Sequence, residues 1–187
     1  MAGEHDVPLR AFPADGYDTS WSTWDGFHRA EVSIRWENEA WTVTGRVDRE
    51  QAEYVLRLSP LWHVRQFLLF RDLPDPDLWL GTDGNGRWGE MNGAHRPELD
   101  GSVDLELAVT PFTWSLPIRR LPLHVGDSID VRTVTIDVDT LAVTPNVRSY
   151  RRTGERTWSI EGVDVGVEFT VDDYGLAIDV EGRFRRN

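Results

Sequence analysis

A period-two alternation of apolar and polar residues dominates the chain from residue 28 onward. Between residues 31 and 36 every second side chain is apolar, and segments 41–47, 54–59, 103–109 and 165–171 follow the same rule. Successive side chains of a strand point to opposite faces, so this period is typical of strands with one buried and one hydrated face. No stretch sustains the helical period of about 3.6 residues. The sequence therefore predicts an all-β protein.

Short polar turns separate the predicted strands. Asp83-Gly84-Asn85-Gly86 predicts a hairpin between residues 78–81 and 87–91, because Asn and Gly tolerate positive φ. Further strands are predicted in the C-terminal third, at residues 129–139, 141–152, 157–161, 165–171 and 176–184. Roughly ten strands in series predict an antiparallel meander that forms an open or incompletely closed β-barrel.

Two segments depart from simple alternation. Trp62–Phe70 carries apolar side chains on both faces, which predicts a strand that is covered on both sides or lines a cavity. Residues 114–121 predict the only helix, a short turn, because Pro117 is tolerated near a helix start.

The domain organisation is predicted to be simple. Residues 1–27 have little periodicity and several Pro and Gly, and we expect an irregular N-terminal arm. Residues 28–187 then form a single β-barrel-like domain. The first residues lack the basic and apolar regions of a signal peptide, and no apolar run approaches the roughly 18 residues of a membrane span. We expect a cytoplasmic protein without a transmembrane segment.

Charge and composition exclude several classes of function. The net charge of -12 disfavours a nucleic-acid partner, since the phosphate backbone would be repelled. The absence of cysteine excludes disulfides and thiolate catalysis. Gly84–Gly89 matches G-x-G-x-x-G but lies between two strands instead of opening a helix, and the 5 histidines lack metal-ligand spacing. We therefore expect no cofactor and no metal.

Paired carboxylates are the main candidates for acid–base chemistry. Asp104 and Glu106 share one strand face, as do Asp137 and Asp139. Such neighbours can raise one another's pKa. In so acidic a chain, hydrated strand faces account for them more simply, and we predict no catalytic residue.

The stretch Thr110–Leu121 (TPFTWSLPIRRL) is the most distinctive in the chain. Its simpler interpretation is a structural corner whose arginines bond carbonyl or carboxylate oxygens. The alternative places Arg119 or Arg120 at the mouth of an apolar cavity, where a guanidinium would bind a phosphate, sulfate or carboxylate.

These segments resemble the putative glycolipid-binding family of bacteria, from about residue 40 to the end of the chain. The resemblance rests on Trp62, Leu80, Gly84–Trp88, Leu99–Asp104, Thr110–Leu121, Tyr150–Arg152, Val171–Leu176 and Gly182–Arg186. Trp114 stands where members of the family usually carry Asn, and Ser102 stands where Cys is common.

The resemblance implies a fold similar to the bacterial lipoprotein carriers, in which an open barrel surrounds an apolar groove. It implies a lipid or glycolipid partner, and we expect non-catalytic binding of a long-chain amphiphile in that groove. The candidate ligand-binding residues comprise apolar walls and three arginines at the rim: Trp62, Phe67, Leu69, Trp79, Trp88, Trp114, Arg65, Arg119 and Arg120. Two alternatives stay open, an enzyme acting on a small hydrophobic substrate in the same cavity and a filled barrel that binds another protein. Alternation is the same in hollow and filled barrels.

Overall fold

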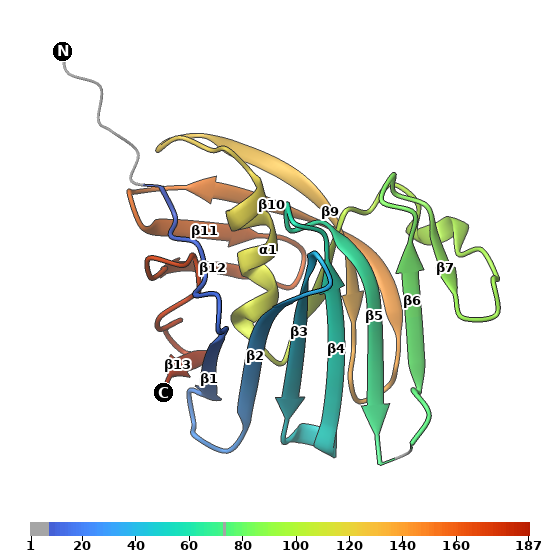
Figure 1. Ribbon diagram of the computed structural model, residues 1–187. Helices are drawn as coiled ribbons and strands as arrows, with labels where there is room; N and C mark the ends of the chain where they lie inside the picture. The colour runs from blue at the N-terminus through green and yellow to red at the C-terminus, as the bar shows by residue number, and fades with distance from the viewer. Residues whose placement is uncertain (1–7, 73) are drawn as a thin grey trace.

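The protein is built from two β-sheets and one short helix (Figure 1). The computed structural model describes residues 8–72 and 74–187. The larger sheet is curled into an open half-barrel, so the predicted fold class is confirmed. No helix in the described ranges is long and apolar enough to cross a membrane.

The larger sheet has eight antiparallel strands in the order β13-β1-β2-β3-β4-β5-β6-β7. Their bounds are β1 Tyr17–Thr23, β2 Arg29–Glu37, β3 Ala40–Val47, β4 Ala52–Leu58, β5 Val64–Arg71, β6 Leu78–Thr82, β7 Trp88–Glu90 and β13 Phe184–Arg186. The predicted hairpin between β6 and β7 is present, with Gly84 and Gly86 at φ 83° and 89°. Strand β1 pairs on its other edge with β13, where Trp21 faces Arg186.

The smaller sheet has five strands in the order β12-β11-β10-β9-β8. Their bounds are β8 Asp104–Leu107, β9 Ser128–Ile136, β10 Val143–Arg152, β11 Thr157–Glu161 and β12 Gly166–Thr170. The β8–β9 pair is parallel, an exception to the predicted meander. Parallel neighbours need a crossover connection, and here residues 108–127 supply it.

The crossover contains the predicted helix. A 3-10 turn, η3 (Pro111–Trp114), leads directly into α1 (Ser115–Arg120), drawn in yellow in Figure 1. The hydroxyl of Thr110 accepts a hydrogen bond from the Phe112 N–H at 3.3 Å, which caps the turn. Leu116 and Ile118 of α1 are buried, so the crossover forms part of the core.

Two predictions about chain organisation are wrong in part. Residues 17–23 of the expected irregular arm form β1; residues 8–16 carry no strand, and residues 1–7 lie outside the described residues. The strand expected at 176–184 is replaced by turns and two isolated bridges. The reason is local: Gly182 has φ 72°, and the N–H groups of Arg183 and Phe184 both donate to the Val180 carbonyl oxygen at 2.9 Å, so the chain turns within the expected strand.

Candidate functional site

Three of the predicted wall residues lie in the packed core. Phe67 and Leu69 are 0% exposed and Trp114 is 4% exposed. The Trp114 ring centroid is 5.3 Å from that of Phe169 and 6.0 Å from that of Phe184. Other side chains of the protein surround these three residues, and their role in ligand binding stays a prediction.

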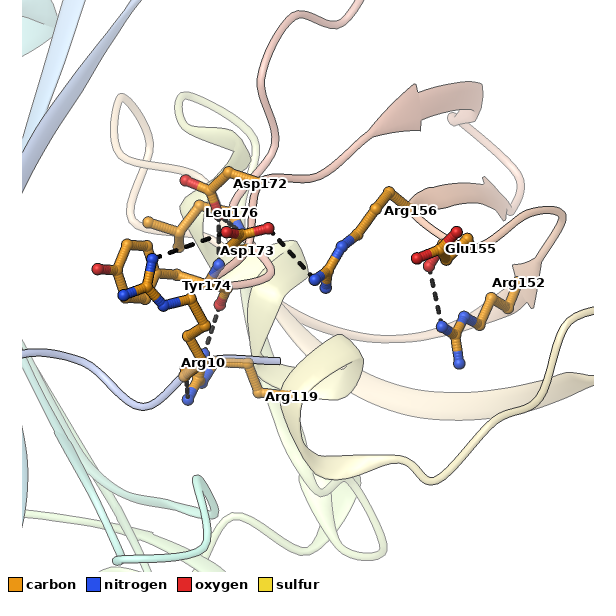
Figure 2. A network of polar contacts seen from close by, with 9 residues as sticks. All are labelled: Arg10, Arg119, Arg152, Glu155, Arg156, Asp172, Asp173, Tyr174 and Leu176. Carbon is orange, nitrogen blue, oxygen red and sulfur yellow. Dashed lines mark hydrogen bonds and ion pairs between the residues drawn. The ribbon is translucent and has the colours of Figure 1, made fainter. Parts of the chain in front are cut away.

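Trp62 and Arg119, far apart in sequence, lie together at one end of the half-barrel. The Arg119 Cζ lies 4.5 Å from the ring centroid of Trp62 and 4.5 Å from that of Phe12, so two aromatic rings enclose the guanidinium. Arg119 donates hydrogen bonds to the carbonyl oxygens of Tyr174 and Arg10, the latter at 3.3 Å (Figure 2). Trp62 has φ 67°, and this left-handed turn precedes β5.

The Arg119 guanidinium is largely desolvated. Burial lowers its pKa to about 10, partly opposed by the charge of Asp172, so it is a cation at neutral pH. Within residues 8–72 and 74–187 it makes no ion pair, and its buried Nε has no hydrogen-bond partner.

Aromatic side chains extend from Arg119 toward solvent. The ring centroids of Trp62 and Trp41 are 5.7 Å apart, and those of Trp41 and Trp36 are 5.1 Å apart. Trp36, at the outer end, is 43% exposed. We call the group the Arg119 cluster; it comprises Phe12, Tyr17, Trp36, Trp41, Trp62, Arg119 and Tyr174. Sequence reasoning missed Phe12, because its segment has no periodicity.

A pocket of about 400 Å³ opens beside Arg119, and we call it the Arg119 pocket. Its walls combine seven apolar residues with four polar or charged ones: Pro8, Leu9, Ile118, Arg119, Leu121, Pro122, Leu123, His124, Arg152, Glu155 and Trp158. Arg152 donates to the carbonyl oxygens of Leu123 and Glu155, at 2.8 and 2.9 Å (Figure 2 shows the second bond). Its guanidinium lies 5.9 Å from the ring centroid of Trp158.

Three other predicted residues meet in a second pocket of about 500 Å³, which we call the Trp79 pocket. Arg65, Trp79 and Trp88 contribute to its lining. Trp88 is only 1% exposed, and its indole N–H donates to the Ser102 carbonyl oxygen at 2.9 Å, so its ring belongs to the packed core behind the pocket.

Arg120 belongs to neither pocket, and its environment corrects the interpretation of the nearby carboxylates. Asp104 and Glu106 were expected on a hydrated face, yet they are 1% and 6% exposed. Arg120 pairs with Asp104, while Arg148, itself 0% exposed, bonds both oxygens of Glu106 at 2.9 and 3.1 Å. The expectation is wrong because η3 and α1 fold back over the strand that carries both acids.

Burial governs the electrostatics of this ionic layer. It raises the pKa of Asp104 to about 6, although the charge of Arg120 opposes the shift. Burial also raises the pKa of Tyr150 well above its usual range, and the charges of Glu106 and Asp104 add to the effect. Neither Asp104 nor Glu106 lines the Arg119 pocket or the Trp79 pocket.

Comparison with known proteins identifies the family. Residues 18–186 match the family described as putative glycolipid-binding. The chain belongs to this family. A DUF1089 family protein from Pseudomonas aeruginosa, known from a crystal structure, is similar to this family member over 96% of both chains, at 25% identity and a TM-score of 0.71. No curated protein matches the chain.

Proposed function

We propose that this member of the glycolipid-binding family binds a glycolipid or another long-chain amphiphile without converting it chemically. The apolar chain would occupy the Arg119 pocket, and the polar head would reach Arg119. The observation that carries the proposal is that one pocket of about 400 Å³ combines apolar walls with an enclosed cation that has no carboxylate partner in the described chain. Ligand sites typically have volumes of about 300–1,000 Å³ and a few convergent polar groups.

The hydrogen bonds of Arg119 explain how a head group would enter. The two bonds to the Arg10 carbonyl oxygen are 3.3 Å long, against a usual N–H···O distance of about 2.9–3.0 Å. A ligand oxygen that replaces this carbonyl keeps these Arg119 N–H groups bonded, and the carbonyl oxygen of Arg10, an exposed residue, can bond to water instead.

The apolar walls supply the remaining affinity. Leu9, Ile118, Leu121, Leu123 and Trp158 all line the Arg119 pocket. Each methylene removed from water stabilises binding by about 0.8 kcal/mol, and the sum must exceed the entropy lost on association. A chain without a head group should therefore still bind, but more weakly.

Substitution of Arg119 tests the proposal. Decanoate and decane would be titrated into wild type and Arg119→Ala, with native mass spectrometry of detergent-free protein to detect any co-purified lipid. Loss of a charged hydrogen bond, about 1.5–3 kcal/mol, should weaken decanoate binding roughly tenfold to a hundredfold and decane binding much less. Arg46→Ala, at an exposed position on β3, is the control.

A second variant separates binding from misfolding. Leu121→Trp fills the Arg119 pocket and leaves Arg119 in place, so both ligands should bind more weakly and by a similar factor. Equal losses of decanoate and decane in Arg119→Ala would contradict the head-group role. No uptake of either ligand by wild type would exclude the amphiphile proposal.

A further inference from the structure

The Trp79 pocket lies on the outer face of β5, β6 and β7 and shares no lining residue with the Arg119 pocket. Trp79 is half-buried on β6, whereas its neighbour Leu80 is 0% exposed and faces the core. A Cβ at Gly81 would lie 3.0 Å from the Trp79 ring, so the ring extends over this glycine. Gly81 pairs with Gly89 on β7, where an added Cβ would lie 3.1 Å from the Ala94 carbonyl oxygen, so the ring and the loop after β7 both lie close to the backbone of these strands.

Hydrogen-bonding side chains line the rest of the Trp79 pocket. The polar lining comprises Arg65, Gln66, Thr82, Asp83, Arg87, Glu90 and His95. Arg65 reaches the pocket through a bulge: Leu58 pairs with Val64 and Arg57 with Gln66, which leaves Arg65 unpaired in the ladder. Bulges re-aim a side chain in this way.

The β6–β7 turn is built around Arg65. The Arg65 guanidinium donates to the Asp83 carbonyl oxygen at 3.3 Å. A Cβ at Gly84 would lie 1.5 Å from Arg65 Nη1, and Gly84 has φ 83°. Only glycine satisfies both conditions. The Asp83 carboxylate accepts from the N–H groups of Asn85 and Arg87 at 2.7 and 3.1 Å, which fixes its direction.

The opposite side of the pocket is also held in place. His95 Nε2 lies 2.7 Å from Asp100 Oδ2, and Asp100 accepts from the Trp88 N–H at 3.2 Å. Arg96 bonds Glu90 at 2.7 Å. These bonds hold the polar groups in place without a ligand, which reduces the entropy lost on binding.

We infer that the Trp79 pocket binds a neutral saccharide. A sugar ring has an apolar C–H face, which suits the electron-rich face of an indole, and hydroxyl groups that both donate and accept hydrogen bonds. The pocket offers donors in Arg65 and Arg87 and acceptors in Asp83 and Glu90. These two cations and two anions balance, so a charged ligand gains no net attraction.

The inference adds a second site to the proposed function, in which the head group reaches Arg119, and the saccharide of a glycolipid is one ligand that this site would take. It requires no acyl chain, however. The two claims can therefore be tested with different ligands, and a saccharide would bind with decanoate absent.

The test uses soluble saccharides without an acyl chain. Methyl glucoside, methyl galactoside, methyl mannoside and maltotriose would be titrated into the full chain and followed by tryptophan fluorescence and calorimetry. Wild type should bind at least one saccharide with a millimolar Kd, and Trp79→Ala should weaken that binding at least tenfold. Trp24→Ala, which lines neither pocket, should bind as wild type does.

Gly81→Ala keeps every polar group and only displaces the Trp79 ring, because its Cβ would lie 3.0 Å from that ring. A several-fold loss of saccharide affinity is expected, with no change in the unfolding midpoint. Absence of binding by every saccharide at up to about 50 mM would overturn the inference, as would unchanged affinity in Trp79→Ala. Decanoate uptake that persists in either case would leave the proposed function intact.

Discussion

The two sheets bury different kinds of inner face. On the larger sheet a row of residues crosses five neighbouring strands in register, and every member is 0% exposed: Ile34, Val43, Leu56, Phe67 and Leu80. On the smaller sheet the corresponding interior contains Asp104, Glu106 and Arg148 in ion pairs. The apolar row needs only burial, whereas each buried charge needs its own partner. Single substitutions should therefore act differently in the two sheets.

The largest effect is expected from Arg148→Met in the smaller sheet. It leaves the Glu106 carboxylate buried without its cation, which should lower the free energy of unfolding by about 3–5 kcal/mol in urea denaturation. The double variant Glu106→Leu/Arg148→Met removes both charges and should recover most of that loss. If the stability losses of the single variants Glu106→Leu and Arg148→Met add up in the double variant, the two residues do not stabilise the fold as a pair.

A smaller effect, the pH dependence of the free energy of unfolding, also distinguishes the two sheets. The folded-state pKa of Asp104, about 6, lies above its ordinary value of 3.8, so the folded state binds this proton more tightly. Its contribution is fully present below pH 3.8 and is lost as the pH rises through 6.

The free energy of unfolding of wild type, minus that of Asp104→Asn, should thus increase by about 2 kcal/mol between pH 7.5 and pH 4.5. Leu56→Ala, in the apolar row, should differ from wild type by a constant amount over the same range. A flat difference for Asp104→Asn would contradict the raised pKa.

The smallest effect is expected on the outer face of the larger sheet. Arg46 and Glu53 face each other on β3 and β4, 3.8 Å apart, with side chains 67% and 58% exposed. Arg46→Ala should change the free energy of unfolding by less than about 0.5 kcal/mol, because water and salt screen the pair. Measurements at low and high salt would check this. A loss above about 1 kcal/mol would show that this exposed ion pair stabilises the fold in spite of solvent screening.

Strands were predictable in both sheets, but the buried faces of the smaller sheet were not. Period-two alternation and the Asp83–Gly86 turn are local signals, and they located β2 to β7 and all five strands of the smaller sheet, while β1 and β13 were missed. Alternation placed Asp104 and Glu106 on one face, but it does not say which face is covered. That depends on η3 and α1, which follow β8 in sequence and fold back over it.

The candidate sites were predictable only in part. The sequence offered aromatic and arginine residues as candidates, but the grouping of Trp62 with Arg119 and of Arg65 with Trp79 is tertiary. A bulge re-aims Arg65, and no residue type in its segment signals that register shift. Phe12 was missed because a segment without strand or helix has no pattern to interpret.

The pairing of β1 with β13 has a consequence for biosynthesis. Strands β1 to β7 are hairpin neighbours and can associate as they are translated, but the free edge of β1 must wait for Phe184–Arg186. During that interval the nascent chain presents an unpaired strand edge to other chains, which is a route to strand exchange and aggregation. The three residues of β13 therefore cover the edge of β1, and they do so only after the rest of the larger sheet has been synthesised.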